Sequence, residues 1–139
     1  MADQFDLVII GGGPGGYAAA FYGASAGLSV ALVEKDTLGG TCLNRGCIPA
    51  KAFLETAAAR RHAEHAKEFG IDTIVGVTDF AVAQARKQKI VDQLVKGLTG
   101  LTKAKKVTYM LGVGSLNADG TVTVVGAEGT TTVSGRSVV

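Results

Sequence analysis

The sequence is poor in cysteine, in net charge and in long apolar runs. Two cysteines in 139 residues exclude a disulfide-dense miniprotein. No apolar run approaches the roughly 18 residues that a membrane-spanning helix needs, and the first six residues hold two acids and no basic residue, unlike a signal or transit peptide. The net charge of +2 is too small to indicate nucleic-acid binding by itself. We therefore expect a cytoplasmic protein whose partners are neither membranes nor nucleic acids.

Glycine is the residue type in excess, with 20 of 139 residues, and half of the glycines fall between Gly11 and Gly46. Glycine tolerates positive φ and close backbone approach, so this clustering predicts tight turns in one functional region. The hydrophobic fraction of 47% is sufficient for the core of one domain.

The first part of the chain has the pattern of a β-α-β unit. Residues 5–10 form a β-branched run typical of a buried parallel strand, a small-residue helix runs from Tyr17 to about Gly27, and residues 28–33 resemble a second strand. Such a unit predicts parallel strands joined by a right-handed crossover. The fold class is therefore predicted to be α/β with a parallel sheet and crossover helices.

Two longer helices and a group of short strands are expected in the rest of the chain. The first helix runs from the cysteine segment to about Glu68, and the second begins after an N-cap at Asp79. From residue 107 on, short strands separated by turns at 118–120 and 127–129 predict a small antiparallel meander, and residues 137–139 resemble the start of another strand.

The helix expected after Asp79 has an apolar and a basic face. Its buried stripe is expected to comprise Ile90, Leu94, Leu98 and Leu101, and its solvated face Arg86, Lys87, Lys89 and Lys96. Because no aromatic residues are interleaved between Arg86 and Lys106, we interpret the basic residues as a solvated face, not as a nucleic-acid site.

A glycine-rich motif lies between the first strand and the first helix. Gly11, Gly13 and Gly16 form G-x-G-x-x-G, and Glu34 follows Gly13 by 21 residues. In this context the glycines permit close approach of a pyrophosphate to a helix N-terminus, and the acid accepts hydrogen bonds from a ribose diol. The motif predicts a bound dinucleotide without distinguishing FAD from NAD.

The two cysteines form a C-x4-C motif at Cys42 and Cys47. In a continuous helix their side chains would lie about 140° apart, so a disulfide requires an interruption, which Gly46 can provide. A loop this small gives only about 2 kcal/mol of stabilisation, which favours a bond that is broken in function. Arg45 and Lys51 would favour the thiolate. A zinc site with His62 and His65 is a less favoured alternative, and no metal ligands are assigned.

Residues 39–51, GGTCLNRGCIPAK, closely resemble the redox-active segment of the pyridine nucleotide–disulfide oxidoreductases. These FAD flavoproteins include dihydrolipoamide dehydrogenase, glutathione reductase and mercuric reductase. Leu43 and Ile48 resemble the dihydrolipoamide dehydrogenase branch most, whereas Arg45 and Ala50 depart from its usual residues. The alternatives are another disulfide or mercuric-ion reductase of the family, or a non-catalytic dinucleotide-binding or redox-sensing module.

The resemblance implies a Rossmann-like FAD-binding domain, of which residues 1–139 are the N-terminal part, with the NAD and dimerisation domains absent. It implies tightly but non-covalently bound FAD, NAD as co-substrate, protein-bound dihydrolipoamide as the dithiol, and a full-length homodimer; the 139-residue chain alone is expected to be inactive. Cys42 is implied as the interchange thiol, with Cys47 and Lys51 beside the flavin. The implied cofactor-binding residues are Gly11, Gly13, Pro14, Gly16, Glu34, Lys35, Gly40, Thr41, Lys51 and Gly114.

Overall fold

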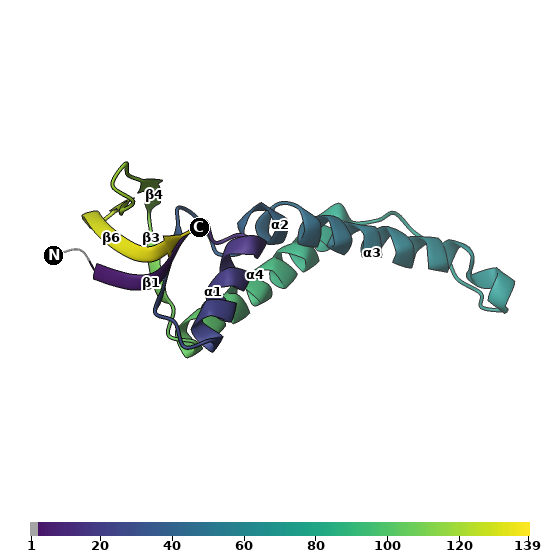
Figure 1. Ribbon diagram of the computed structural model, residues 1–139. Helices are drawn as coiled ribbons and strands as arrows, with labels where there is room; N and C mark the ends of the chain where they lie inside the picture. Colours follow the sequence, from purple (N-terminus) through teal and green to yellow (C-terminus); the bar gives the residue numbers. More distant parts are fainter. Residues whose placement is uncertain (1–2) are drawn as a thin grey trace.

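The β-branched run near the N-terminus forms the central strand of a six-stranded sheet. In the computed structural model, which describes residues 3–139, β1 (Asp3–Ile10) pairs in parallel with β2 (Val30–Glu34) on one side and with β6 (Gly129–Val138) on the other. Strand β3 (Thr108–Leu111) pairs in parallel with β2, and the strand order is β3-β2-β1-β6-β5-β4. The helices lie on one side of this sheet (Figure 1).

Helix α1 (Pro14–Ser25) connects β1 to β2, so the predicted β-α-β unit is confirmed. Its boundaries differ slightly from the expected ones. The helix begins at Pro14, whose ring fixes φ near the helical value and suits the first helical position. Strand β2 begins at Val30, and the side chain of the preceding Ser29 donates a hydrogen bond to the Asp6 carboxylate.

The sheet is buried on both faces, which explains its continuous apolar runs. On one face, a cluster packs between the strands and the helices; it comprises Ile9, Ala20, Val30, Leu32, Leu38 and Val107. On the other face, a second cluster lies under the antiparallel strands; it comprises Val8, Ala31, Val33, Val122, Val124 and Val133. The parallel sheet therefore carries the predicted antiparallel meander, β4 (Val113–Leu116), β5 (Val122–Gly126) and the first half of β6.

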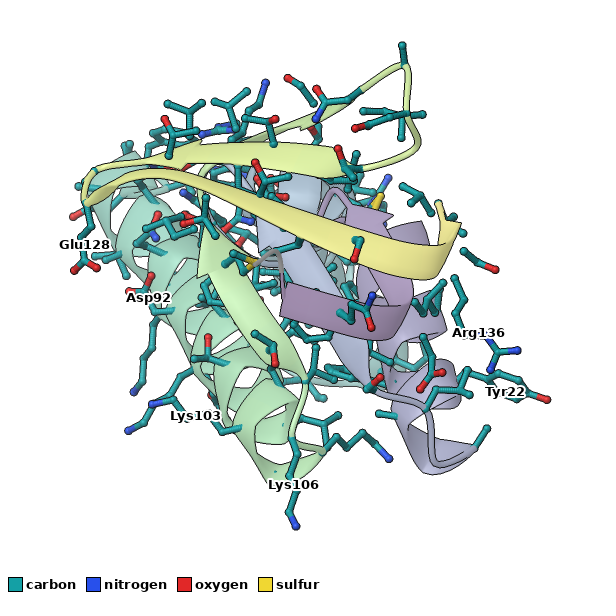
Figure 2. All side chains as sticks on the ribbon, turned by 60° about the vertical axis from the view of Figure 1, so that its left-hand side comes forward. Tyr22, Asp92, Lys103, Lys106, Glu128 and Arg136 are labelled. Atoms are coloured by element: carbon teal, nitrogen blue, oxygen red, sulfur yellow. A yellow bond between two sulfur atoms is a disulfide. The ribbon has the colours of Figure 1, made fainter. Side chains whose placement is uncertain are left out.

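Strand β6 corrects the expectation that a new strand starts at Ser137. Residues 129–133 pair antiparallel with β5, while residues 133–138 pair parallel with β1 within the same ten-residue strand. One strand thus belongs to both the meander and the parallel sheet. Figure 2 shows Glu128 at the outer tip of the β5–β6 turn.

Four helical segments follow β2: α2 (Gly40–Asn44), α3 (Cys47–Glu64), the short 3-10 helix η1 (Ala66–Phe69) and α4 (Phe80–Ala104). The expected single helix to Glu68 is therefore split, and Gly70, at φ 76°, closes it. Helices α3 and α4 pack together and project from the sheet as an arm (Figure 1). Between them the rings of Phe53 and Phe80 are stacked, with their centroids 5.4 Å apart. No helix within residues 3–139 combines the length and the apolar character required to cross a bilayer.

The faces of α4 differ from the prediction. Leu94 and Leu101 are exposed, and the buried line lies beside them, at Ala83, Lys87, Val91 and Thr102. Lys87, expected on the solvated face, is only 9% exposed and donates a hydrogen bond from Nζ to Gln88 Oε1 at 2.9 Å. The cause is that α4 contacts α3 with its first half and the sheet with its second, so one apolar stripe does not describe it. Lys103 and Lys106 extend into solvent from the end of α4 (Figure 2).

Asp79 caps α4 as predicted, because its Oδ1 accepts hydrogen bonds from the backbone N–H groups of Ala81 at 2.9 Å and Val82 at 3.3 Å. We expect Asp79→Ala to lower the free energy of unfolding by about 1 kcal/mol, since two N–H groups at the helix start lose their acceptor. Urea unfolding followed by circular dichroism measures this. The control, Asp72→Ala, removes the same charge from an exposed position in the same connection and should change stability little; equal losses would contradict the cap.

Candidate active site

The turn between β1 and α1 is built for close backbone approach. Gly11 adopts φ 109°, which favours glycine, and donates its N–H to the Val33 carbonyl oxygen at 2.7 Å. A Cβ on Gly16 would overlap the Gly11 carbonyl oxygen, so α1 packs directly on the turn. Helix α1 begins immediately afterwards, with Gly13 as N-cap and Pro14 as its first residue. Its first turn therefore presents N–H groups without intrahelical partners, an arrangement suited to a phosphate.

Glu34, the last residue of β2, is buried beside this turn at 8% exposure. Its Oε2 accepts a hydrogen bond from the Gly12 N–H at 2.7 Å, and its Oε1 accepts one from the Asp36 N–H at 2.9 Å. The carboxylate thus joins the glycine turn to the loop after β2. Each carboxylate oxygen can accept a further hydrogen bond, so both remain available to ligand hydroxyl groups.

A cavity of about 300 Å³ opens at the carboxyl ends of β1 and β2. It is lined by Ile10, Gly11, Val33, Glu34, Lys35, Gly112, Val113 and Gly114. A Cβ on Gly114 would lie 3.0 Å from Val33 Cγ1, so glycine at this position keeps the cavity open. The structure therefore brings four of the predicted cofactor-binding residues, Gly11, Glu34, Lys35 and Gly114, to one cavity at the edge where open α/β sheets bind ligands.

The loop that leads into α2 packs against the glycine turn. Gly39 and Gly40 both have positive φ, at 100° and 56°, and the Gly39 N–H donates to the Gly12 carbonyl oxygen at 2.8 Å. A Cβ on Gly40 would lie 2.8 Å from Gly13 Cα. The start of α2, including Gly40 and the exposed Thr41, is consequently held beside the N-terminus of α1.

Cys42 and Cys47 form a disulfide, with their Cα atoms 4.7 Å apart. The helix is interrupted between them, as the sequence required: α2 ends at Asn44 and α3 begins at Cys47. Cys42 is half-buried and Cys47 is exposed. Cys47 is the first residue of an 18-residue helix, where the positive end of the helix dipole would favour its thiolate after reduction.

The charged groups around the disulfide are distributed unevenly. Arg45, expected to serve a thiolate, forms an ion pair with Asp36, and the hydrogen bond and charge of its guanidinium hold the pKa of that carboxyl below its usual value. Lys51 is exposed one helical turn after Cys47, on the same side of α3. Tyr109 of β3 has its pKa raised, first by burial and then by the negative charges of Glu34 and Asp36.

The four residues of the alternative zinc site do not come together. Both cysteines are in the disulfide, and His62 follows Cys47 by fifteen residues along α3, a rise of about 22 Å. His65 Nδ1 lies 3.1 Å from Glu68 Oε1 at the outer end of the arm. This separation removes the geometric basis of that alternative.

Two residues of the site were not predicted. Gly12 occupies the variable position of G-x-G, but its N–H binds Glu34, and a Cβ there would lie 2.9 Å from Leu38 Cδ2. Asp36 binds both Glu34, through its N–H, and Arg45, through its carboxylate. The sequence carries no spacing signal for either contact, because each depends on the path of the loop after β2.

Comparisons with known proteins agree with this geometry. The family described as pyridine nucleotide-disulphide oxidoreductase matches residues 5–138. The chain is 43% identical to dihydrolipoyl dehydrogenase of Chlamydia pneumoniae, and the match covers 94% of this chain and 28% of that protein. It is 47% identical to a dihydrolipoyl dehydrogenase of Bacillus subtilis, and the match covers 84% of this chain and 24% of that protein. A solved structure, the Cu(II) complex of the HOCl-induced flavoprotein disulfide reductase RclA from Escherichia coli, superposes with a TM-score of 0.81 at 27% identity, covering 98% of this chain and 28% of that one. The chain thus spans about a quarter of the length of these proteins.

Proposed function

The chain belongs to the pyridine nucleotide–disulphide oxidoreductase family, and we propose that it is the N-terminal, FAD-binding and disulfide-carrying part of a dihydrolipoyl dehydrogenase-like enzyme. In this proposal a protein-bound dihydrolipoyl group is oxidised at the Cys42–Cys47 disulfide, and NAD is the final acceptor. The supporting observation is the contact of Gly40 with Gly13, which sets the disulfide helix beside the predicted phosphate-binding turn. The greater length of the relatives supports the assignment of residues 1–139 to part of one FAD domain within a longer enzyme, which we propose is a homodimer.

The residues present fit FAD. The turn from Gly11 to Gly16 and the N-terminus of α1 would hold the pyrophosphate, Glu34 would accept the ribose hydroxyls, and the cavity next to Gly114 would take the adenine. Lys35 and Thr41 would line the surface along which FAD lies. Bound FAD would supply two-electron transfer between the reduced cysteine pair and NAD.

The cysteines carry out the exchange with the substrate. A substrate thiolate attacks Cys42 Sγ, the disulfide breaks, and Cys47 leaves as a thiolate; the second substrate thiolate then attacks the mixed disulfide and releases Cys42. The substrate dithiol loses two electrons, and the protein disulfide gains them. The N-terminal position of Cys47 in α3 and the nearby Lys51 stabilise the leaving thiolate. In this proposal Cys47, the more exposed of the two cysteines, would be the one that faces the flavin ring.

Visible absorbance and a steady-state assay test the proposal. The full-length protein that carries this segment should show flavin bands and oxidise dihydrolipoamide with NAD, whereas the 139-residue chain alone should not turn over. A full-length protein that instead reduces glutathione disulfide or mercuric ion would identify another branch of the family. A colourless protein would remove the flavin assignment altogether.

We expect Glu34→Ala to weaken FAD binding by roughly 10- to 100-fold, because a charged acceptor worth about 1.5 to 3 kcal/mol is lost from buried hydroxyl groups. Flavin retained after dialysis of the full-length protein measures the effect. Glu128→Ala removes an equally charged side chain from the exposed β5–β6 turn, outside the lining of the cavity, and serves as the control (Figure 2). Unchanged flavin content in Glu34→Ala would leave the carboxylate with only its backbone partners, Gly12 and Asp36.

A further inference from the structure

The turn between the two cysteines is tied to the loop after β2 by one ion pair. Arg45, in the four-residue bridge from Cys42 to Cys47, places Nη2 against Asp36 Oδ2. Asp36 is itself fixed, since its N–H donates to Glu34 Oε1 at 2.9 Å and its Oδ1 accepts from the Thr37 hydroxyl at 3.2 Å. The tie therefore runs from the redox turn to the buried carboxylate that holds the glycine turn.

We propose that Arg45 is a positioning residue for the disulfide: its pair with Asp36 holds the turn in the geometry in which the two sulfurs meet. The proposal rests on the proposed function only in assigning Cys42–Cys47 a redox role. It adds Arg45, one of the two residues of this segment that depart from the usual residues of the dihydrolipoamide dehydrogenase branch.

The need for such a tie arises when the disulfide opens. The sulfurs then lose their covalent link, and the only covalent connection between α2 and α3 is the backbone of Arg45 and Gly46. Gly46 has a non-helical backbone, with φ −124° and ψ −102°, and glycine has the largest conformational freedom in the absence of a constraint. Asn44 already secures the α2 side, because its Nδ2 donates to the Leu38 and Gly40 carbonyl oxygens at 3.1 and 3.0 Å. Arg45 secures the position next to Gly46.

The effect is modest and has a defined sign. The side chains of Arg45 and Asp36 are 68% and 48% exposed, and exposed pairs of this kind change equilibria by about two- to fivefold. The ion pair and the disulfide favour the same geometry of the turn, so their equilibria are linked. The factor by which the ion pair favours formation of the disulfide equals the factor by which the disulfide favours formation of the ion pair. Loss of either partner should therefore shift the thiol–disulfide equilibrium toward the reduced form.

Equilibration of the full-length protein with reduced and oxidised dithiothreitol tests this. Dithiothreitol gives up two electrons and two protons and becomes its cyclic disulfide, while Cys42–Cys47 becomes two thiols, which are counted by alkylation and mass spectrometry. We expect Arg45→Gln and Asp36→Asn each to raise the equilibrium constant for reduction of the disulfide two- to fivefold. The double variant should raise this constant no further than either single variant. The charge-swapped pair, Arg45→Asp with Asp36→Arg, should restore the wild-type constant.

Salt distinguishes this role from a simple packing effect, since 1 M NaCl screens exposed charges over about 3 Å. Under that condition the wild-type protein should converge on the single variants. A shift in Arg45→Gln without one in Asp36→Asn would overturn the proposal, because the charge of Arg45 would then act alone. Shifts that persist unchanged in 1 M NaCl, or no shift at all, would also overturn it. Failure of the proposed function is read separately, as absent flavin or absent NAD-linked turnover.

Discussion

Cys42→Ser is expected to abolish dithiol exchange completely, because no disulfide remains for a substrate thiolate to attack. In the full-length, FAD-loaded protein it should leave Cys47 free as a thiolate, favoured by the N-terminus of α3. A thiolate against oxidised flavin should give a long-wavelength absorption band without added reductant, and this band should persist near neutral pH. The measurements are an absorption spectrum, its pH titration and a count of reactive thiols, which should exceed that of the oxidised wild-type protein by one per chain.

Cys47→Ser is the matched control for the division of labour between the sulfurs. It should lose activity to the same extent but show no long-wavelength band, since the remaining sulfur, Cys42, is half-buried in α2. A band in Cys47→Ser and none in Cys42→Ser would reverse the two roles. Absence of the band from both variants would mean that the disulfide is not coupled to a flavin.

Gly16→Ala should have the largest effect on stability among single substitutions in the glycine turn. The added Cβ would overlap the Gly11 carbonyl oxygen, which belongs to the backbone and cannot rotate away. The helix and the turn must then separate, at a cost of about 3 kcal/mol in the free energy of unfolding. Because the displaced turn is the proposed pyrophosphate site, flavin retention should fall as well. Denaturant unfolding and dialysis measure the two effects.

Gly15→Ala is a control at the adjacent position. A Cβ on Gly15 meets open space within 4 Å, and alanine is a better helix former than glycine. This variant should be as stable as the wild-type protein or more stable, by up to about 1 kcal/mol. If both alanine variants unfold at the same denaturant concentration, α1 does not pack on the turn as tightly as the structure indicates.

The parts of the fold that sequence predicts well are those determined by neighbouring residues. The β-branched run of β1, the N-cap at Asp79 and the interruption before Cys47 all follow from local chemistry, and the structure has each of them. Glu34 could be placed at the end of β2 by its spacing from Gly13 alone. The two antiparallel turns were likewise indicated by their glycines.

The parts that could not be predicted depend on tertiary contacts. The buried side of α4 changes along its length as its partner changes from α3 to the sheet, so the position of Lys87 could not be read from one periodic stripe. The Asp36–Arg45 pair joins residues nine positions apart through a loop whose path is set by Gly39 and Gly40. Neither feature leaves a pattern in the amino-acid order, because both arise from where whole segments come to rest.

The pairing of β1 with β6 has a consequence for how the chain acquires its structure during synthesis. Val8 lies opposite Val138, so 130 residues must be added after Val8 before its second neighbouring strand exists. Meanwhile β1 can pair only with β2, and the β5–β6 hairpin, whose contacts are local, forms its own pairing rapidly. Docking of that finished hairpin against β1 should therefore be the slow step, and until it occurs one edge of the nascent sheet stays open to other strands.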